Sequence, residues 1–284
     1  MEWERAKTYI LLFFVLLNII LGSLLVVERR RYSITSGREQ AIIEIMHRNN
    51  ITMEAQVMRR FPPMRLMYIG GFDYDVEELI GIFFGDATVG RAYTQHRSVF
   101  THGQGELTIA HGFISYDNPS GHGGRAQWMP DLNQAEAERL SNAFVQAHWA
   151  DFRLEDVFVG PDWVHFSYRQ VYRGYVIHSN FIEVLVTERG IVQVEMQFGR
   201  VLEVDRERQP ITAPDEALLT FVQWIRPRVM APITVIRMDL VYFQDEGSPD
   251  PDGRYRLEPF YRVFIGGGER DPLLINAFTN EIIN

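Results

Sequence analysis

The chain has 284 residues, with 37 acidic and 28 basic side chains and a formal net charge of −9. This length allows two domains with cores of ordinary size, and the acidity disfavours nucleic acid and anionic lipid surfaces as partners. The sequence contains no cysteine, which excludes disulfides, thiol catalysis and cysteine-ligated zinc.

An uncharged, largely apolar segment, Thr8–Val27, follows the charged N-terminus. As a helix it would reach about 30 Å, the thickness of the hydrocarbon layer of a bilayer. Glu28 and the arginines at 29–31 end the segment, and they provide no small-residue cleavage site of a signal peptide. We therefore expect an uncleaved transmembrane helix at 8–27, preceded by a short tail of residues 1–7.

The charges that flank this anchor leave its orientation open. Two basic residues precede the apolar segment and three follow it directly, which weakly favours a cytoplasmic body. Long domains can nevertheless be translocated despite flanking charges, so either side of the membrane is compatible with the sequence.

Three small or polar residues interrupt the apolar segment. Asn18 lies at its middle, and Gly22 and Ser23 follow near the same helical face. An amide in hydrocarbon needs a hydrogen-bond partner, and small residues let a second helix approach closely. We predict that Asn18, Gly22 and Ser23 contact a partner helix in the membrane. The alternative is that the Asn18 amide bonds only to its own helix.

The fold class predicted for the body is α+β, with helices packed on one face of antiparallel sheets in each of two domains. The first domain is expected at residues 32–124, ending in a Gly-rich loop that suits a linker, Asn118–Gly124. Its expected elements, in chain order, are a helix from Thr35 or Ser36 to about His47, a short amphipathic piece at 51–58, a strand at 65–69, an apolar segment at 76–84 that suits helix or strand, and short strands over 91–116.

The second domain is expected at residues 125–284. Its pattern predicts a helix over 131–149 with Asp131 or Asn133 at its start, and an antiparallel meander over 157–198. It also predicts a helix that begins with a Thr212 cap and Pro214. Three further strands are expected at 233–243, 254–265 and 273–278. Both domains begin with a helix followed by strands, which suggests two diverged copies of one unit.

The histidines of the first domain raise the question of a metal site. Their spacing matches no compact set of ligands, and no cysteine is available to complete a zinc site. We therefore predict that no metal is bound at these residues, which are His96, His102, His111 and His122.

Two acidic segments resemble functional motifs but fit simpler structures. Residues 248–253 resemble the first half of a calcium loop, yet the twelfth position is Pro259 where a bidentate Glu is needed, so we favour a hairpin turn. Asp73, Asp75 and the glutamates at 77–78 could form a general acid–base pair, but acidic residues before an apolar segment more often begin a helix. Because no hydrolase, zinc-protease or nucleotide-binding motif is present, we predict a non-enzyme without a cofactor.

Several segments together resemble one known family. The chain begins Met-Glu-Trp, continues with Arg5-Ala-Lys7-Thr8, and then enters the apolar segment. The later segments that match, in chain order, are 172–176 (YRGYV), 213–217 (APDEA), 257–263 (LEPFYRV) and 275–281 (INAFTNE). In order and spacing they resemble the YycI members of the YycH/YycI family, whose body is similar to PepSY-like repeats. The final Thr-Asn-Glu departs from the usual Thr-Gly-Glu, a change that Asn can accommodate in a turn.

The resemblance implies a single-pass membrane protein with its N-terminus in the cytoplasm and its body outside. It also implies a function: such proteins bind the essential cell-wall sensor histidine kinase (WalK-type) of low-GC Gram-positive bacteria, together with a YycH-type partner. They modulate the kinase partly through transmembrane contacts, with a sign that differs between organisms. The alternative from another class is an anchored, extracytoplasmic ligand-binding or peptidase-inhibiting module of PepSY-like type.

Overall fold

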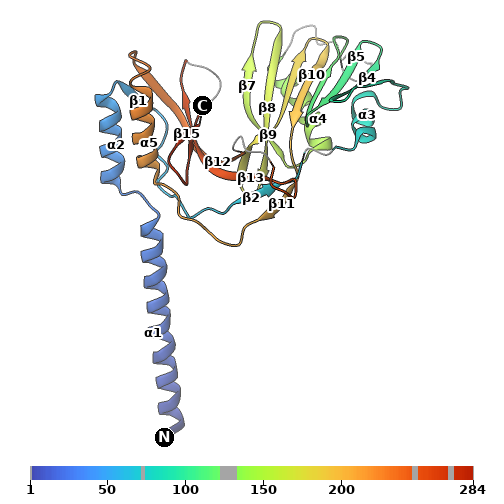
Figure 1. Ribbon diagram of the computed structural model, residues 1–284. Helices are drawn as coiled ribbons and strands as arrows, with labels where there is room; N and C mark the ends of the chain where they lie inside the picture. The colour runs from blue at the N-terminus through green and yellow to red at the C-terminus, as the bar shows by residue number, and fades with distance from the viewer. Residues whose placement is uncertain (1, 72–73, 122–132, 245–248, 268–271, 284) are drawn as a thin grey trace. The chain divides into compact units, whose positions relative to one another are not determined.

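The structure of the chain is a computed structural model that describes residues 2–71, 74–121, 133–244, 249–267 and 272–283. Five α-helices and a large, mainly antiparallel set of strands make up the described residues, which confirms the α+β class (Figure 1). The chain forms two compact units: unit 1 contains residues 1–64, 207–239 and 260–284, and unit 2 contains residues 65–206 and 240–259. This grouping differs from a sequential division, and the predicted boundary at residues 124 and 125 lies outside the described residues.

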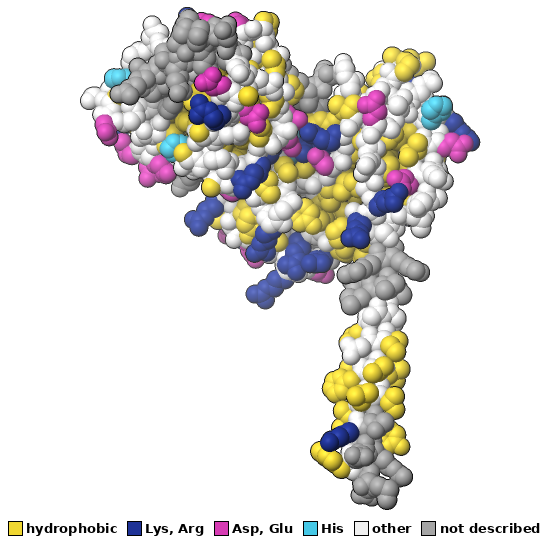
Figure 2. All heavy atoms as spheres, turned by 180° about the vertical axis from the view of Figure 1, so that it is seen from behind, with side chains coloured by type: hydrophobic (Ala, Val, Ile, Leu, Met, Phe, Trp, Pro, Cys, Tyr) yellow, Lys and Arg dark blue, Asp and Glu magenta, His cyan; other side chains and the backbone are white. Residues whose placement is uncertain are grey.

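Helix α1 (Glu2–Arg31) is the first element of unit 1 (Figure 1). All the large apolar side chains described between Tyr9 and Leu21 are exposed, with exposed fractions from 37% to 71%. Figure 2 shows these hydrophobic side chains along the helix. The side chains at positions 8 and 24–27 of the predicted anchor lie outside those that the structure describes. Among the described residues, no helix is both long enough and apolar enough to cross a membrane.

The rest of unit 1 is a small sheet with two helices that lie side by side, α2 and α5 (Figure 1). Its elements are α2 (Ser36–Arg48), β1 (Ile51–Met53), α5 (Pro214–Ile225), the first part of β12 (Ile233–Gln244), the second part of β13 (Tyr255–Ile265), β14 (Leu273–Asn276) and β15 (Ile282–Ile283). Strand β1 pairs in parallel with β12, while β14 pairs antiparallel with both β13 and β15. Both helices bury apolar side chains, among them Ile42 of α2 and Phe221 of α5, which are at most 1% exposed.

Unit 2 is built around a long antiparallel sheet. Its elements are β2 (Met67–Ile69), α3 (Val76–Phe84), β3 (Gly90–Tyr93), β4 (Arg97–His102), β5 (Gly105–Ala110), β6 (Phe113–Asp117), α4 (Gln134–His148), β7 (Phe152–Val159), β8 (Trp163–Tyr172), β9 (Tyr175–Thr187), β10 (Gly190–Gln197), β11 (Val201–Val204), the last part of β12 and the first part of β13. The order of the main strands is β7-β8-β9-β10-β6-β5-β4-β3, and every neighbouring pair is antiparallel.

One face of this sheet forms the core of unit 2 with α3 and α4. Successive strand residues point to opposite faces, so the buried residues of β9, such as Ile182 and Val184, share one face with Tyr116 of β6. Helix α3 adds Phe83, whose ring stacks on Tyr116 with centroids 4.5 Å apart, and α4 adds Phe144. The residues between these positions therefore lie on the other face, which carries the polar groups described below.

Several local predictions are confirmed. Thr35 caps α2 by accepting a hydrogen bond from the Arg38 amide, and Asn133 caps α4 in the same way through the Ala135 amide. Asp75 caps α3, which confirms a helix start for the acidic segment; Asp73 lies outside the described residues.

Other local predictions are wrong. Residues 51–53 form strand β1 rather than part of an amphipathic piece, because they pair with residues 233–235 of β12. Helix α5 has Ala213 as its N-cap without a side-chain bond, since the carbonyl of Thr212 accepts from Tyr261 and its amide donates to Ala277. A short tripeptide pattern cannot reveal such long-range partners.

Candidate functional site

The sequence-predicted contact residues lie on α1. The Asn18 side-chain amide donates to the carbonyl of Phe14 (2.8 Å), and the Ser23 hydroxyl donates to the carbonyl of Ile20 (2.7 Å). A Cβ atom at Gly22 would have no atom within 4 Å. All three predicted residues are exposed. The Asn18 amide thus bonds to its own helix, and its second N–H and its oxygen can also bond to a partner helix.

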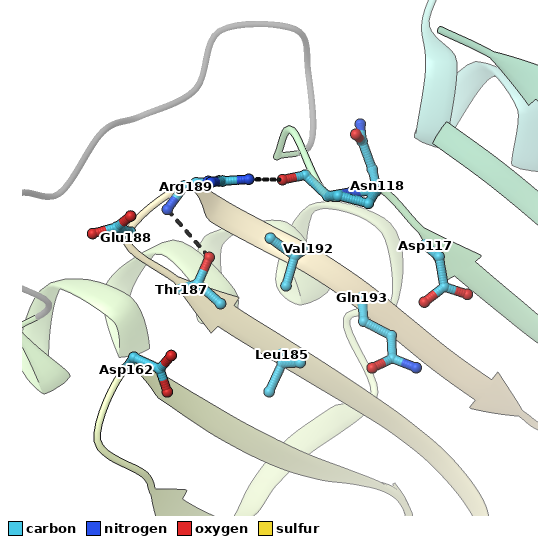
Figure 3. Close-up of a pocket in the computed structure, with 10 residues that line it drawn as sticks. Asp117, Asn118, Asp162, Leu185, Thr187, Glu188, Arg189, Val192 and Gln193 are labelled. Carbon is cyan, nitrogen blue, oxygen red and sulfur yellow. Dashed lines mark hydrogen bonds between the residues drawn. The ribbon is translucent and has the colours of Figure 1, made fainter. Parts of the chain in front are cut away.

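A second candidate is a cavity of about 540 Å³ in unit 2, at one end of strands β6, β9 and β10 (Figure 3). Its lining consists of Asp117, Asn118, Pro119, Asp162, Leu185, Thr187, Glu188, Arg189, Val192 and Gln193. Register explains how distant positions meet here: Gln193 of β10 lies opposite both Asp117 of β6 and Leu185 of β9. A β-bulge between Ile191 and Gln193 interrupts the β9–β10 pairing beside the cavity.

The loop after β6 forms one wall of this cavity. The Asn118 side chain donates to the Tyr116 hydroxyl and to the carbonyl of Gly121, both at 2.9 Å, and accepts from the Ser120 amide. The Arg189 guanidinium donates to the carbonyl of Pro119 (3.1 Å), which Figure 3 marks with a dashed line. The loop is thus held by its own polar groups and by Arg189 of the β9–β10 turn.

The cavity is acidic. Asp117, Asp162 and Glu188 contribute three carboxylates, and within the described residues no arginine or lysine forms an ion pair with any of them. Arg189 is the basic residue of the lining, and its guanidinium bonds to a backbone carbonyl. Such a lining suits a ligand that carries positive charge.

A polar face of the unit 2 sheet adjoins the cavity. One row of facing residues crosses five strands, from Ser167 of β8 through Glu183, Glu195 and Ser115 to Thr108 of β5. Burial raises the pKa of Glu195, the negative charges of Asp117 and Glu183 raise it further, and the hydrogen bond from Gln193 lowers it. The carboxylates of this face therefore repel one another.

A serine, a histidine and an acidic residue, the residue types of a hydrolase triad, also occur on this face. Their contacts differ from those of such a triad. The Ser167 hydroxyl donates to Glu183 Oε1 (2.9 Å), and His165 Nε2 lies 3.4 Å from Glu183 Oε2. Arg169 Nη1 also bonds Glu183, at 2.7 Å. A histidine-activated serine needs the imidazole nitrogen at the hydroxyl, whereas here both groups meet at the carboxylate.

The other motifs of the sequence form turns and surface contacts. Asp250 accepts hydrogen bonds from the amides of Asp252 and Arg254, which confirms the hairpin turn for the part of residues 248–253 that is described. The rings of His96 and His111 stack with centroids 5.4 Å apart; His122 lies outside the described residues. No group of three or more histidine, aspartate and glutamate side chains in the described part of the chain is arranged to hold a metal ion.

The acidic cavity was not foreseen from the sequence. Asp117 ends strand β6, and Glu188 and Arg189 form a turn between strands, where charged residues are common. Nothing in the sequence singles out Asp162. Strand register alone brings them together, and a pattern of turn residues does not specify register.

Comparison with known proteins shows the fold of the chain. No protein-family model and no curated protein matches the sequence. The chain is similar to the crystal structure of an uncharacterized protein from Eubacterium rectale (TM-score 0.55, 12% identity), over 83% of this chain and 91% of that one. It is also similar to the C-terminal domain of Bacillus megaterium YpeB (TM-score 0.42, 9% identity), over 73% of this chain and 93% of that one. At 12% identity the first likeness concerns the fold alone, and the second is too weak to support a conclusion.

Proposed function

We propose that the chain is a membrane-attached, non-enzymatic regulatory protein whose α1 meets partner helices in the lipid. The observation that carries the proposal is the exposure of the apolar side chains of α1 from Tyr9 to Leu21. Burying one such side chain is worth about 1.5–3 kcal/mol, so leaving all of them in water would be strongly unfavourable. A bilayer, with other helices in it, provides the cover that this helix requires.

The partner we propose is a cell-wall sensor histidine kinase of WalK type, acting with a YycH-type protein. The support is the resemblance of the N-terminus and of the later segments to the YycH/YycI family. From the same resemblance we propose that the body lies outside the cell. The Ser167 hydroxyl bonds the Glu183 carboxylate, to which His165 is also turned, and this arrangement favours regulation by contact over histidine-activated catalysis.

Co-purification tests this proposal. Full-length chain would be compared with a chain whose first 31 residues are replaced by an unrelated membrane anchor. We expect the kinase to co-purify with the first and to be lost from the second, because the specific contacts lie in α1. Equal recovery of the kinase with both chains would contradict a role of α1 in recognition.

A second candidate is a ligand-binding module, favoured by the acidic cavity of unit 2. Its carboxylates, which belong to Asp117, Asp162 and Glu188, suit a peptide that carries arginine or lysine side chains. Titration calorimetry of the full-length chain with an oligoarginine peptide, and with an oligoglutamate peptide as control, tests this candidate.

Binding of the basic peptide should weaken in Asp162→Asn. The matched variant is Asp86→Asn, which changes an exposed carboxylate of unit 2 outside the cavity lining. Equal affinity of both variants and the parent chain would remove the cavity as the binding site.

A further inference from the structure

The connection between α1 and the rest of unit 1 is short and fixed. Residues Tyr32–Thr35 separate α1 from α2. The Phe61 amide donates to the Tyr32 carbonyl (3.1 Å), and the Ile34 amide donates to the Arg59 carbonyl (2.9 Å). Ile34 is 5% exposed. A flexible tether would have neither backbone pairing nor a buried apolar side chain.

An ion pair then joins the start of α2 to the start of α5. Arg38 Nε lies 2.6 Å from Asp215 Oδ2, and its Nη2 lies 2.9 Å from Asp215 Oδ1 and 3.1 Å from Glu216 Oε1. The Asp215 side chain is 11% exposed and that of Arg38 is 45% exposed. This bidentate geometry fixes both the orientation and the separation of the two side chains. A single contact from a lysine would fix only the separation.

The far end of this ion pair is fixed to the sheet of unit 1. The residue before the α5 cap, Thr212, donates its amide to the Ala277 carbonyl (2.7 Å) and accepts from the Tyr261 hydroxyl (2.7 Å). Both Tyr261 and Ala277 are fully buried. Contacts therefore run without a break from the end of α1 through α2 and α5 to the sheet.

We propose that Arg38 is a positioning residue that makes this connection rigid, so that a rotation or shift of α1 is passed to α5 and the sheet of unit 1. This inference deepens the proposed function and rests on it, since a partner that meets α1 would supply the movement. Arg38 bonds Asp215 through two nitrogens in one plane, so its role is to set the geometry between α2 and α5. Rigid elements joined by such contacts are a physical route for coupling between distant sites.

Distance measurement by electron paramagnetic resonance tests the proposal in the full-length chain. The sequence has no cysteine, so Ile20→Cys in α1 and Gln223→Cys on the exposed side of α5 can be spin-labelled selectively in detergent micelles. We expect one narrow distance distribution for this doubly labelled parent. Arg38→Met should replace it with a broad distribution at temperatures below its unfolding midpoint, and this midpoint should fall because Asp215 stays buried without its counter-charge. Arg38→Lys should give an intermediate width.

Two further variants make the test decisive. Arg48→Met removes an exposed ion pair with Glu44 on the same helix and should leave the distribution narrow. Asp215→Asn keeps the size of the buried side chain and should broaden the distribution as Arg38→Met does, which covers the case that Arg38→Met does not fold. A broad distribution in the parent, or a narrow one in both Arg38→Met and Asp215→Asn, would overturn the proposal. If the distance distributions have the expected widths but the full-length chain does not co-purify with the kinase, the proposed function is contradicted. The inference of a rigid connection between α1 and α5 would still hold.

Discussion

At the scale of single residues, Arg262 shows how a charge is accommodated in the sheet of unit 1. Its guanidinium is 1% exposed and bonds both oxygens of Asp239, each at 2.7 Å. The Asp239 side chain is 35% exposed, so water reaches the carboxylate but not the cation. The buried Arg262 cation therefore depends on this ion pair for its stabilisation more than the Asp239 carboxylate does.

This asymmetry predicts that Asp239→Asn destabilises the chain more than Arg262→Met. Removing the negative charge of Asp239 weakens two hydrogen bonds to a cation that water does not reach, whereas the Asp239 carboxylate can be hydrated once the arginine is gone. Urea unfolding of both variants measures the two free energies. A larger loss for Arg262→Met would show that packing of the arginine stem outweighs its charge.

The residue predicted to matter most in the membrane is Asn18. We expect Asn18→Leu to weaken association with the kinase by about 1 kcal/mol, the scale of an interhelical hydrogen bond. Its amide already donates to Phe14 (2.8 Å), so only its remaining groups are available to a partner. A bacterial two-hybrid signal that is unchanged in the Asn18→Leu, Gly22→Leu double variant would count against this helix contact.

At the scale of elements, local signals predicted most of the structure. Helix α2, helix α4 and the meander from β7 to β10 have strong periodicity and caps, and they form where the sequence predicts them. The segment of α3 suited helix or strand by pattern, and it became a helix because Asp75 caps it and its apolar face packs on the sheet. Short strands such as β1 and β11 carry no pattern of their own and depend on partners far away in the chain.

The loop of the acidic cavity yields a prediction about two glycines of unit 2. Gly121 has a φ of +88°, and a Cβ there would lie 2.0 Å from the Arg189 carbonyl oxygen. Gly103 has a φ of +58°, but a Cβ there would meet nothing within 4 Å. Strain alone costs an alanine about 1–2 kcal/mol, and the contact with backbone adds to it.

We therefore expect Gly121→Ala to lower the free energy of unfolding clearly more than Gly103→Ala does. Chemical denaturation compares the two variants directly. Equal effects would show that the loop moves away from Arg189 at little cost, and that the wall of the cavity is not fixed.

At the scale of the whole molecule, buried tyrosines make stability sensitive to alkali. Burial raises the pKa of Tyr74, Tyr168 and Tyr242 to about 12 each, above the ordinary value of 10. Below about pH 10 these phenols are neutral in both states, so their contribution is complete. Between about pH 10 and 12 the unfolded chain loses protons that the folded chain keeps, which favours unfolding.

The thermal unfolding midpoint should therefore fall steeply over that interval, and phenolate absorbance should rise in the same interval as the chain unfolds. Tyr74→Phe removes one of the three groups and should make the fall less steep. It also removes the hydrogen bond that Tyr74 accepts from the Phe198 amide (3.0 Å), so its midpoint at neutral pH should be lower. A fall of equal steepness in both chains would contradict this origin of the alkaline sensitivity.

The candidate sites differ in how far the sequence could predict them. Asn18, Gly22 and Ser23 were identified because a polar group in an apolar segment is visible in the sequence itself. The acidic cavity and the Arg38–Asp215 ion pair were not, because each joins residues whose proximity depends on tertiary structure. The cavity depends on the register of the strands and the ion pair on the packing of α2 against α5, and a sequence pattern specifies neither.

The composition of unit 1 from three separate segments has a consequence for biosynthesis. Residues 1–64 emerge from the ribosome long before their partners, since Ile51 of β1 pairs with Ile233 of β12 and β14 follows later still. The main sheet of unit 2 is encoded without interruption between them and can fold while translation continues. The nascent segment next to α1 must therefore wait, with its apolar side chains uncovered, and the part of the protein nearest its N-terminal helix is among the last to acquire its structure.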